Sequence, residues 1–535
     1  MNQSNVSLLD LPNEILITIL KKLDNMDVLY SIMNIGNQRL DNLVLEKTFT
    51  KTLNFVLTTL NDDIVSIDDS IFNQLCINIL PRIDYNVKSL ILESVSMERI
   101  LLAADYPNLT ELKIFNFNEP IFAYYFAVES PIQRFFQQIT DLIIVYKDDK
   151  NTLLMKQYPK GVHGCILKFF ENLKHLSITG LNSILSLRNL PLTTCSSSIL
   201  YKLCINLNTF EDCLALLDGR LKQLTTVIIN INSTDYHSSN VYNMDDLLNM
   251  KCFSLKCRCR KNEYDTKILP LLRRMPNLEE LTLNIINSKR ITFVDGTQIN
   301  NEILIHMPRL YKFIFNINTR TKPNDLVHYL SNDDIQRTFT NIGYEQVCCI
   351  VNYVNIGIGI CHVFSLPFMF DYLEYIGNKF PPIDFSHVVS LGVYDSVPFE
   401  HEFFIRIGRF FPFLKELRVI NFESQSHISS ELNFHDNQLH SIVEYSHLIS
   451  LILMTVHIDY VEQFLNDRKT HLPRLTTLTV DYDQLTIVTE NFTRDITRLN
   501  CTKIKELTIE ESREHSKDFY VYFPLLESCL CSDSD

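Results

Sequence analysis

The stretch Pro276-Asn-Leu278-Glu-Glu-Leu281-Thr-Leu283 contains the pattern that decides the fold. Its last two leucines are two residues apart, the spacing that places side chains on one face of a β-strand. The first leucine lies three residues earlier and closes the bend that leads into the strand. The proline cannot continue a preceding helix, so it ends that helix. The stretch therefore predicts a unit of helix, turn and strand.

The same pattern, Leu-x-x-Leu-x-(Leu/Ile/Val), returns along most of the chain. Its copies, written as three apolar positions, are Val87/Leu90/Leu92, Leu109/Leu112/Ile114, Ile139/Leu142/Ile144, Leu173/Leu176/Ile178, Leu200/Leu203/Ile205, Leu224/Val227/Ile229, Leu278/Leu281/Leu283, Leu310/Phe313/Phe315, Val388/Leu391/Val393, Leu414/Leu417/Val419, Leu448/Leu451/Leu453, Leu475/Leu478/Val480 and Ile504/Leu507/Ile509. A proline stands two residues before the first apolar position at Pro107, Pro276, Pro308, Pro412 and Pro473. Such repeated placement indicates that each proline ends a helix and leads into a strand.

Amphipathic stretches between the copies predict helices. Residues 266–275, 400–411 and 460–468 each carry apolar side chains at the spacing of one helix face. Helix, turn and strand together then make up each unit, and the unit is 30 residues long from Leu112 to Leu142.

This repeat resembles the longer, helix-containing leucine-rich repeats, and the resemblance covers about residues 87–515. It implies an α/β solenoid with parallel strands on the concave face and helices on the convex face. Another right-handed α/β array or a doubly wound domain is the alternative. The position three beyond the last apolar residue, often Asn or Cys in that family, is Asn only at Asn208, Asn232 and Asn318. We therefore expect an irregular solenoid.

One stretch interrupts the repeat. Two β-rich runs, 346–354 and 358–366, flank Asn355-Ile-Gly357. Two such runs around a short turn predict a β-hairpin inserted at about residues 344–366. Two degenerate repeats are the alternative.

Composition excludes several classes of protein. The net charge of −14 does not suit nucleic-acid binding, because phosphate contacts need clustered Lys and Arg. With 12 glycines in 535 residues, the chain has no phosphate-cradling loop. No apolar run is long enough to span a membrane, and the first residues lack the pattern of a secretory signal. We therefore expect the 14 cysteines to be reduced thiols of a cytoplasmic or nuclear protein.

The N-terminal stretch Leu11-Pro-Asn-Glu-Ile-Leu-Ile-Thr-Ile-Leu-Lys-Lys-Leu23 predicts a short helix. Pro12 suits its first turn, and Glu14 suits the positive end of its dipole. One apolar stripe is expected to comprise Ile15, Leu16, Ile19, Leu20 and Leu23. Asp27 can cap a second helix that begins at Val28 and Leu29.

These residues resemble the F-box, the adaptor-binding segment of substrate receptors in Skp–cullin ubiquitin ligases. The match covers about residues 8–50. The resemblance implies that this segment docks on a Skp-type adaptor and that the repeats take an unknown protein substrate. The adaptor-binding residues that it implies are Leu11, Pro12, Glu14, Ile15, Leu16, Ile19, Leu20, Leu23, Asp27 and Leu29.

The chain departs from the F-box pattern after residue 33. The family usually ends its third helix with Val-Cys-(Lys/Arg)-x-(Trp/Phe), where this chain has Asn34-Ile-Gly-Asn-Gln-Arg-Leu40. Leu40 is expected to fill the place of the aromatic residue. A helical cap for the solenoid is the alternative reading of the segment. A protein-binding scaffold without ligase coupling is the alternative function.

The predicted organisation is thus α/β, with an all-α F-box over residues 1–50. The solenoid with its hairpin covers 51–515, and a cap with an acidic tail covers 516–535.

The residues that could carry chemistry have simpler explanations, so we expect no catalytic activity, cofactor or metal. Zinc sites need four ligands, whereas Cys252, Cys257 and Cys259 lack a second pair. We expect Cys252 and Cys257, with Leu255, to occupy apolar positions of a degenerate copy. His401-Glu402 begins like a zinc-protease helix, but the second histidine of that motif is missing.

Positions directly after the apolar strand residues are expected to face the concave side and to form a partner surface. They comprise Asn206, Asn230, Asn284, Asn316, Tyr394, Ile420 and Met454, followed by Asp481 and Glu510. Aromatic and methionine side chains are typical interface anchors. The alternative is that asparagine simply suits a solvated strand end.

Overall fold

The computed structural model describes a mixed α/β chain with N-terminal helices and a large, mostly parallel sheet that is not closed. The described residues are 8–33, 35–58, 64–65, 67–117, 124–125, 130–146, 166–167, 169–180, 184–185, 197–219, 221–231, 245–259, 262–321, 329–340, 346–354, 358–426, 442–509 and 516–531. Over these ranges, no helix has the length and apolar character needed to cross a membrane.

The chain divides into two compact units. The first comprises Met1–Cys257 and Leu271–Glu280, and the second comprises Arg258–Pro270 and Leu281–Asp535.

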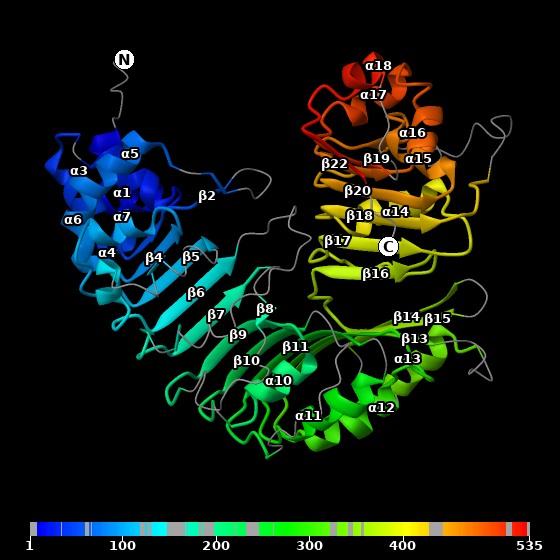
Figure 1. Ribbon diagram of the computed structural model, residues 1–535, viewed down its shortest axis with the longest axis horizontal. Helices are drawn as coiled ribbons and strands as arrows, with labels where there is room; N and C mark the ends of the chain where they lie inside the picture. Colours follow the sequence, from blue (N-terminus) through cyan, green and yellow to red (C-terminus); the bar gives the residue numbers. More distant parts are fainter. Residues whose placement is uncertain are drawn as a thin grey trace, which may run out of the picture. The chain divides into compact units, whose positions relative to one another are not determined.

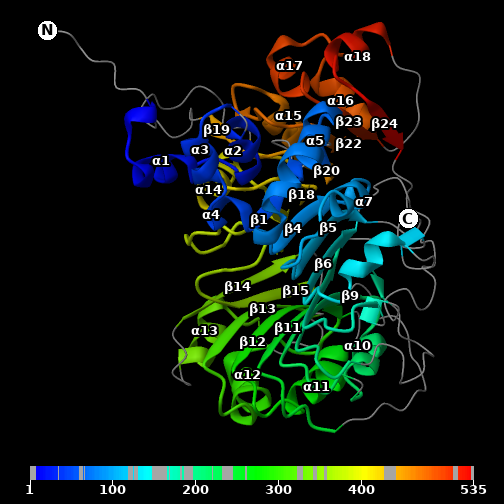
Figure 2. The same cartoon turned by 90° about the vertical axis from the view of Figure 1, so that its left-hand side faces the viewer.

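The first unit begins with helices and continues as parallel strands. Its helices are α1 (Asn13–Leu20), α2 (Asn25–Ile32), α3 (Gln38–Val44), α4 (Lys47–Thr50), α5 (Asp69–Gln74), α6 (Leu80–Ile83), α7 (Met97–Leu102) and α10 (Phe210–Leu216). Its strands are β1 (Thr52–Asn54), β2 (Leu57–Thr58), β3 (Ile64–Val65), β4 (Ser89–Glu93), β5 (Glu111–Phe117), β6 (Asp141–Tyr146), β7 (His175–Thr179), β8 (Ile184–Leu185), β9 (Lys202–Leu207), β10 (Thr226–Ile231) and β11 (Cys252–Cys259), the last of which extends two residues into the second unit. Figure 1 shows β4 to β10 side by side, and Figure 2 shows α1, α2 and α3 together near β1.

The repeat pattern sets the register of these strands. Leu112 pairs with Leu142, Leu142 with Leu176, and Leu176 with Leu203 in successive parallel ladders. All four leucines are buried. Burying such a side chain contributes about 1.5–3 kcal/mol. The strand positions predicted from the repeat are therefore present, and equivalent positions stack into one core.

The cysteine-containing copy is shifted by two residues from the predicted frame. Phe253 pairs with Val227, and Cys252 pairs with Thr226 on the other face of β11. The apolar positions are therefore Met250, Phe253 and Leu255, all of them buried. Cys252 is only partly buried, so its assignment to the core was wrong. The described residues contain no group of three or more His, Cys, Asp or Glu side chains that could hold a metal ion, at these cysteines or elsewhere.

The second unit contains the hairpin and a parallel sheet. Its strands are β12 (Glu280–Asn287), β13 (Lys312–Thr321), β14 (Val347–Val354), β15 (Ile358–Ser365), β16 (Tyr372–Ile376), β17 (Ser390–Tyr394), β18 (Glu416–Asn421), β19 (Val443–Glu444), β20 (Ser450–Val456), β21 (Thr470–His471), β22 (Thr477–Val480), β23 (Glu506–Ile509) and β24 (Ser528–Cys531). Its helices are α11 (Leu269–Arg273, shared with the first unit), α12 (Gly296–Glu302), α13 (Asn332–Thr340), α14 (His401–Phe410), α15 (Ile458–Leu465), α16 (Tyr482–Val488), α17 (Asp495–Cys501) and α18 (Lys517–Tyr522). β14 and β15 pair in antiparallel register, so the interruption of the repeat is a hairpin and not two degenerate copies.

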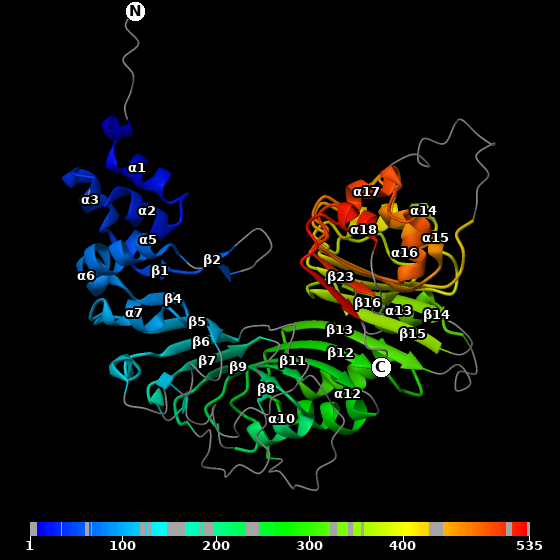
Figure 3. The same ribbon diagram turned by 45° about the horizontal axis from the view of Figure 1, so that its top comes forward.

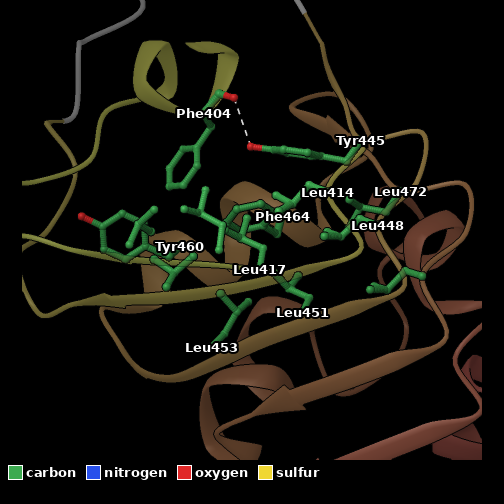
Figure 4. Close-up of a cluster of buried hydrophobic side chains, with 14 of the residues drawn as sticks. Phe404, Leu414, Leu417, Tyr445, Leu448, Leu451, Leu453, Tyr460, Phe464 and Leu472 are labelled. Atoms are coloured by element: carbon green, nitrogen blue, oxygen red, sulfur yellow. Dashed lines mark hydrogen bonds between the residues drawn. The ribbon is translucent and has the colours of Figure 1, made fainter. Parts of the chain in front are cut away.

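Seven parallel strands form the C-terminal sheet, in the order β16-β17-β18-β20-β22-β23-β24. Helices α14 to α18 lie on one side of it (Figure 3). Leu414, Leu417, Leu448 and Leu451 from two neighbouring copies pack beneath Phe404 of α14 (Figure 4). The Tyr445 hydroxyl donates to the Phe404 carbonyl over 3.0 Å, which satisfies a polar group inside this core.

A further copy of the repeat lies in the region predicted as a cap and tail. Cys529 pairs with Leu507, and Cys531 pairs with Ile509, in the parallel ladder of β23 and β24. The copy therefore reads Pro524-x-Leu526-x-x-Cys529-x-Cys531. The repeat pattern did not predict this copy, because cysteine stands at both strand positions in place of leucine, isoleucine or valine.

Candidate functional site

Helix α1 has two different apolar faces. Leu16 and Leu20 are 1% and 5% exposed, whereas Ile15, Ile19 and Leu23 in and after the helix are 47%, 42% and 54% exposed. The expected single stripe is therefore wrong, because residues three and four apart share a face and adjacent ones do not. The inner leucines hold the helix to the protein. The outer residues form an apolar surface that the described residues leave uncovered.

Helix α3 packs against the inner side of α1, although residues 34–40 depart from the pattern discussed above. Asn37 caps α3 by accepting from the backbone N–H groups of Arg39 and Leu40. Leu40 packs with Leu16 and Leu43 in a small buried cluster.

Arg39 holds the segment that precedes α1. Its guanidinium donates to the carbonyl of Leu9 over 2.7 Å, to the carbonyl of Leu11 and to Asn13 Oδ1 over 2.8 Å. These three bonds fix the backbone on both sides of Leu11 and leave Pro12 exposed.

The remaining residues that were predicted to bind an adaptor lie in different environments. The N-cap of α2 is Asp24, whose carboxylate accepts from the Met26 N–H over 2.8 Å. The predicted cap, Asp27, was wrong, because it lies three residues further along the chain. Asp27 lies in the first turn and is exposed. Leu29 is fully buried, and Glu14 is exposed. Leu29 is therefore inaccessible to a partner.

The predicted asparagine row is a hydrogen-bonded ladder. Asn230 donates to Asn206 over 2.9 Å, and Asn206 donates to the carbonyl of Gly180 over 2.9 Å. In the second unit, Asn316 donates to Asn284 over 3.1 Å. Asn206, Asn284 and Asn316 are almost fully buried, so they are removed from the predicted partner surface. Their amides bond one another across strands instead of facing solvent.

The later positions of the predicted partner surface reach a hollow over β16, β17 and β18. It encloses about 100 Å³ and is lined by Tyr372, Glu374, Tyr375, Ser390, Leu391, Gly392, Val393, Tyr394, Glu416, Arg418 and Ile420. Tyr394 and Ile420, two positions of the predicted partner surface, therefore both line this hollow. Met454 lies on the next strand, β20, and is partly buried. Asp481 caps α16 by accepting from Gln484, and Glu510 lies outside the described residues.

A β-bulge shapes one wall of the hollow. Leu373 pairs with Leu391, but the next pair is Ile376 with Val393, so β16 carries an extra residue. Tyr375 occupies it with φ of +61°, a left-handed conformation that a bulky residue adopts at a cost of about 1–3 kcal/mol. Bulges re-aim side chains. This one turns Tyr375 toward Tyr394, with the ring centroids 5.9 Å apart.

Glu374 lies at the centre of an ion-pair cluster beside the hollow. Arg258 Nη2 donates to both of its carboxylate oxygens over 3.1 Å, and Arg320 and Tyr372 also donate to it. The Arg320 guanidinium lies 3.7 Å from the centroid of the Tyr375 ring. The carboxylate is buried, and these three donors offset the loss of water around its charge.

The environment keeps the hydroxyls of the hollow protonated. Burial, and then the charge of Glu374, raises the pKa of Tyr372. Burial and the neighbouring Tyr375 raise the pKa of Tyr394. Both tyrosines are therefore hydrogen-bond donors at neutral pH.

Sequence reasoning missed Glu374, Tyr375, Gly392 and Arg418. The one available signal was the three-residue step from Leu373 to Ile376, which breaks the strand pattern. No motif could have found Arg258 and Arg320, because they come from strands far apart in the sequence.

A scan against protein-family models finds no match, and a search of the curated proteins finds no similar sequence.

Proposed function

We propose that the chain is an F-box-type substrate receptor, which binds a Skp-type adaptor through its N-terminal helices and a protein partner through its repeats. Under this proposal the chain recruits its partner to a cullin ubiquitin ligase and performs no catalysis itself. The proposal rests on the motif from Leu11 to Leu29 together with the repeat that follows it.

The observation that carries the proposal is the exposed face of α1. Ile15 and Ile19 lie one turn apart on a different face of the helix from the buried Leu16 and Leu20. A short helix that exposes two isoleucines is suited to dock into an apolar groove of a partner. Covering each of them is worth on the order of 1 kcal/mol.

The repeats support the second half of the proposal. The parallel strands place side chains on the face opposite the core, in register between β17 and β18 and with a register shift after Arg418 between β18 and β20. Repeat proteins that bind other proteins use such a strand face. This arrangement is consistent with the leucine-rich-repeat solenoid that the sequence resembles.

Binding of purified Skp-type adaptor to the full chain tests the proposal. Ile15→Asp with Ile19→Asp should abolish binding, because it places two charges in the apolar contact. Ile77→Asp is the matched control, since Ile77 is an exposed isoleucine of the same unit outside the motif. Adaptor binding that survives the double substitution would contradict the assignment of this face.

A ligase-independent protein-binding scaffold is the second candidate. It is favoured by the departure of residues 34–40 from the F-box pattern. A chain that binds no adaptor but still binds a partner through its repeats would support this candidate over the first.

A further inference from the structure

We propose that Arg39 is a positioning residue for the adaptor-binding face of α1 and controls how fast an adaptor binds there. This inference rests on the proposed function, because it takes the exposed face with Ile15 and Ile19 to be the contact. It adds a residue of α3 that acts on the contact without belonging to it.

The adaptor-binding face begins at Pro12, directly before α1. Pro12, Ile15 and Ile19 are three and four residues apart, so they share one face, and all three are exposed. Packing holds the C-terminal part of α1, whose inner leucines are buried. The start of the face lacks such support, because residues 8–15 include no buried side chain and only Leu11 is partly buried.

Hydrogen bonds from Arg39 supply the support that packing does not give. Its Nη1 donates to the Leu9 carbonyl over 2.7 Å, its Nη2 donates to the Leu11 carbonyl, and its Nε donates to Asn13 Oδ1 over 2.8 Å. We call these three bonds the Arg39 clamp. The acceptors lie on both sides of Pro12, so the clamp fixes the backbone from which Pro12 projects. A planar guanidinium suits such a set of acceptors, whereas an ammonium group presents a single nitrogen.

Arg39 is itself held in place by the start of α3. Asn37 accepts from the Arg39 backbone N–H over 3.0 Å, which fixes the first turn of this helix. The next residue, Leu40, is buried and packs with Leu16 of α1. The clamp therefore connects the packed side of α1 to the exposed segment before it.

Without the clamp, residues 8–12 would leave the binding-competent arrangement for part of the time. The apparent affinity for a partner falls in proportion to the competent fraction. Most substitutions in an interface act on the dissociation rate, whereas a rearrangement that must precede binding lowers the association rate. A positioning role therefore predicts slower association and a dissociation rate that changes little.

Surface plasmon resonance with a purified Skp-type adaptor and the full chain measures both rates. Arg39→Met removes the donors, and Arg39→Lys keeps the charge but not the three bonds. Both variants should slow association about fivefold. Dissociation should change by less than about twofold. Arg39 is exposed, so neither variant removes buried packing.

Arg134→Met is the matched control. Arg134 is an exposed arginine of the same unit that also donates to a backbone carbonyl, that of Ala104 over 3.5 Å. It lies outside residues 8–50, so both rates should equal those of wild type.

Unchanged association in either Arg39 variant would overturn the positioning role, because the three bonds would then not be needed. A loss that disappears between about 0.05 M and about 0.5 M salt would overturn it as well, since a charge contact with the adaptor would then explain the loss.

The wild-type chain separates this inference from the proposed function. Wild type that binds no adaptor would contradict the proposed function and the role of Arg39 together. Wild type that binds the adaptor, with Arg39 variants that match it, would contradict only the role of Arg39.

Discussion

His362 is a buried histidine on β15 whose charge state links pH to stability. Its Nε2 lies 3.4 Å from Asn318 Nδ2. Burial, and then the charge of Arg320, lowers its pKa from 6.5 to about 3. The folded protein therefore keeps this imidazole neutral, whereas the unfolded chain takes up a proton as the pH falls below 6.5. The stability that depends on the neutral form is present above that pH and is lost below it.

His362→Gln should remove this part of the pH dependence. Between about pH 7.5 and about pH 5.5, wild type should lose about 1.4 kcal/mol more of its free energy of unfolding than the variant. Urea denaturation at the two pH values measures the difference. Parallel losses in the two proteins would show that His362 does not carry the effect.

Arg39 is the residue that holds the backbone in front of helix α1. Arg39→Lys keeps the charge but cannot reproduce its three bonds to Leu9, Leu11 and Asn13. We expect the opening free energy of the backbone before α1 to fall by about 1–2 kcal/mol. Hydrogen exchange of residues 8–20 measures it, with Arg337→Lys as a control at an exposed site. Unchanged exchange in Arg39→Lys would show that the clamp is unimportant.

At the scale of elements, the strand positions were predictable and the details of the site were not. Alternation of apolar residues decides which side chains face the core, and equal spacing decides the register. The bulge at Tyr375 follows no local rule, because one extra residue can be absorbed in several places. The burial of Asn284 and Asn316 could not be predicted from the sequence either, because it depends on which strands lie beside them.

The contact between α12 and α13 gives a test of packing at this scale. A Cβ on Gly296 would lie 2.7 Å from the backbone of Thr338 and Phe339, too close for any side chain. Gly296→Ala should therefore destabilise the second unit by about 1–3 kcal/mol. Gly408→Ala in α14 meets its nearest neighbour at 3.4 Å and should be close to neutral, because alanine favours the helix. Equal thermal midpoints for the two variants would contradict the predicted close approach.

At the scale of the whole chain, the sequence predicted helices followed by an α/β repeat, and both are present. The pattern failed at two places, both of which contain cysteine. The copy at Met250, Phe253 and Leu255 was misplaced by two residues because Cys252 and Cys257 were taken as its apolar positions, and the copy at β24 was missed because cysteine stands at its strand positions. The exposed face of α1 with Ile15 and Ile19 belongs to the first unit, and the hollow belongs to the second. Each can therefore be altered by substitutions that leave the other intact.

Size-exclusion chromatography of the full chain with a purified Skp-type adaptor tests the central claim most directly. We expect a stable complex for wild type and for Arg418→Gln, and no complex for the chain carrying Leu11→Ala with Pro12→Ala. Separate elution of wild type and adaptor would contradict the claim. A complex that persists in the double variant would show that the adaptor binds elsewhere.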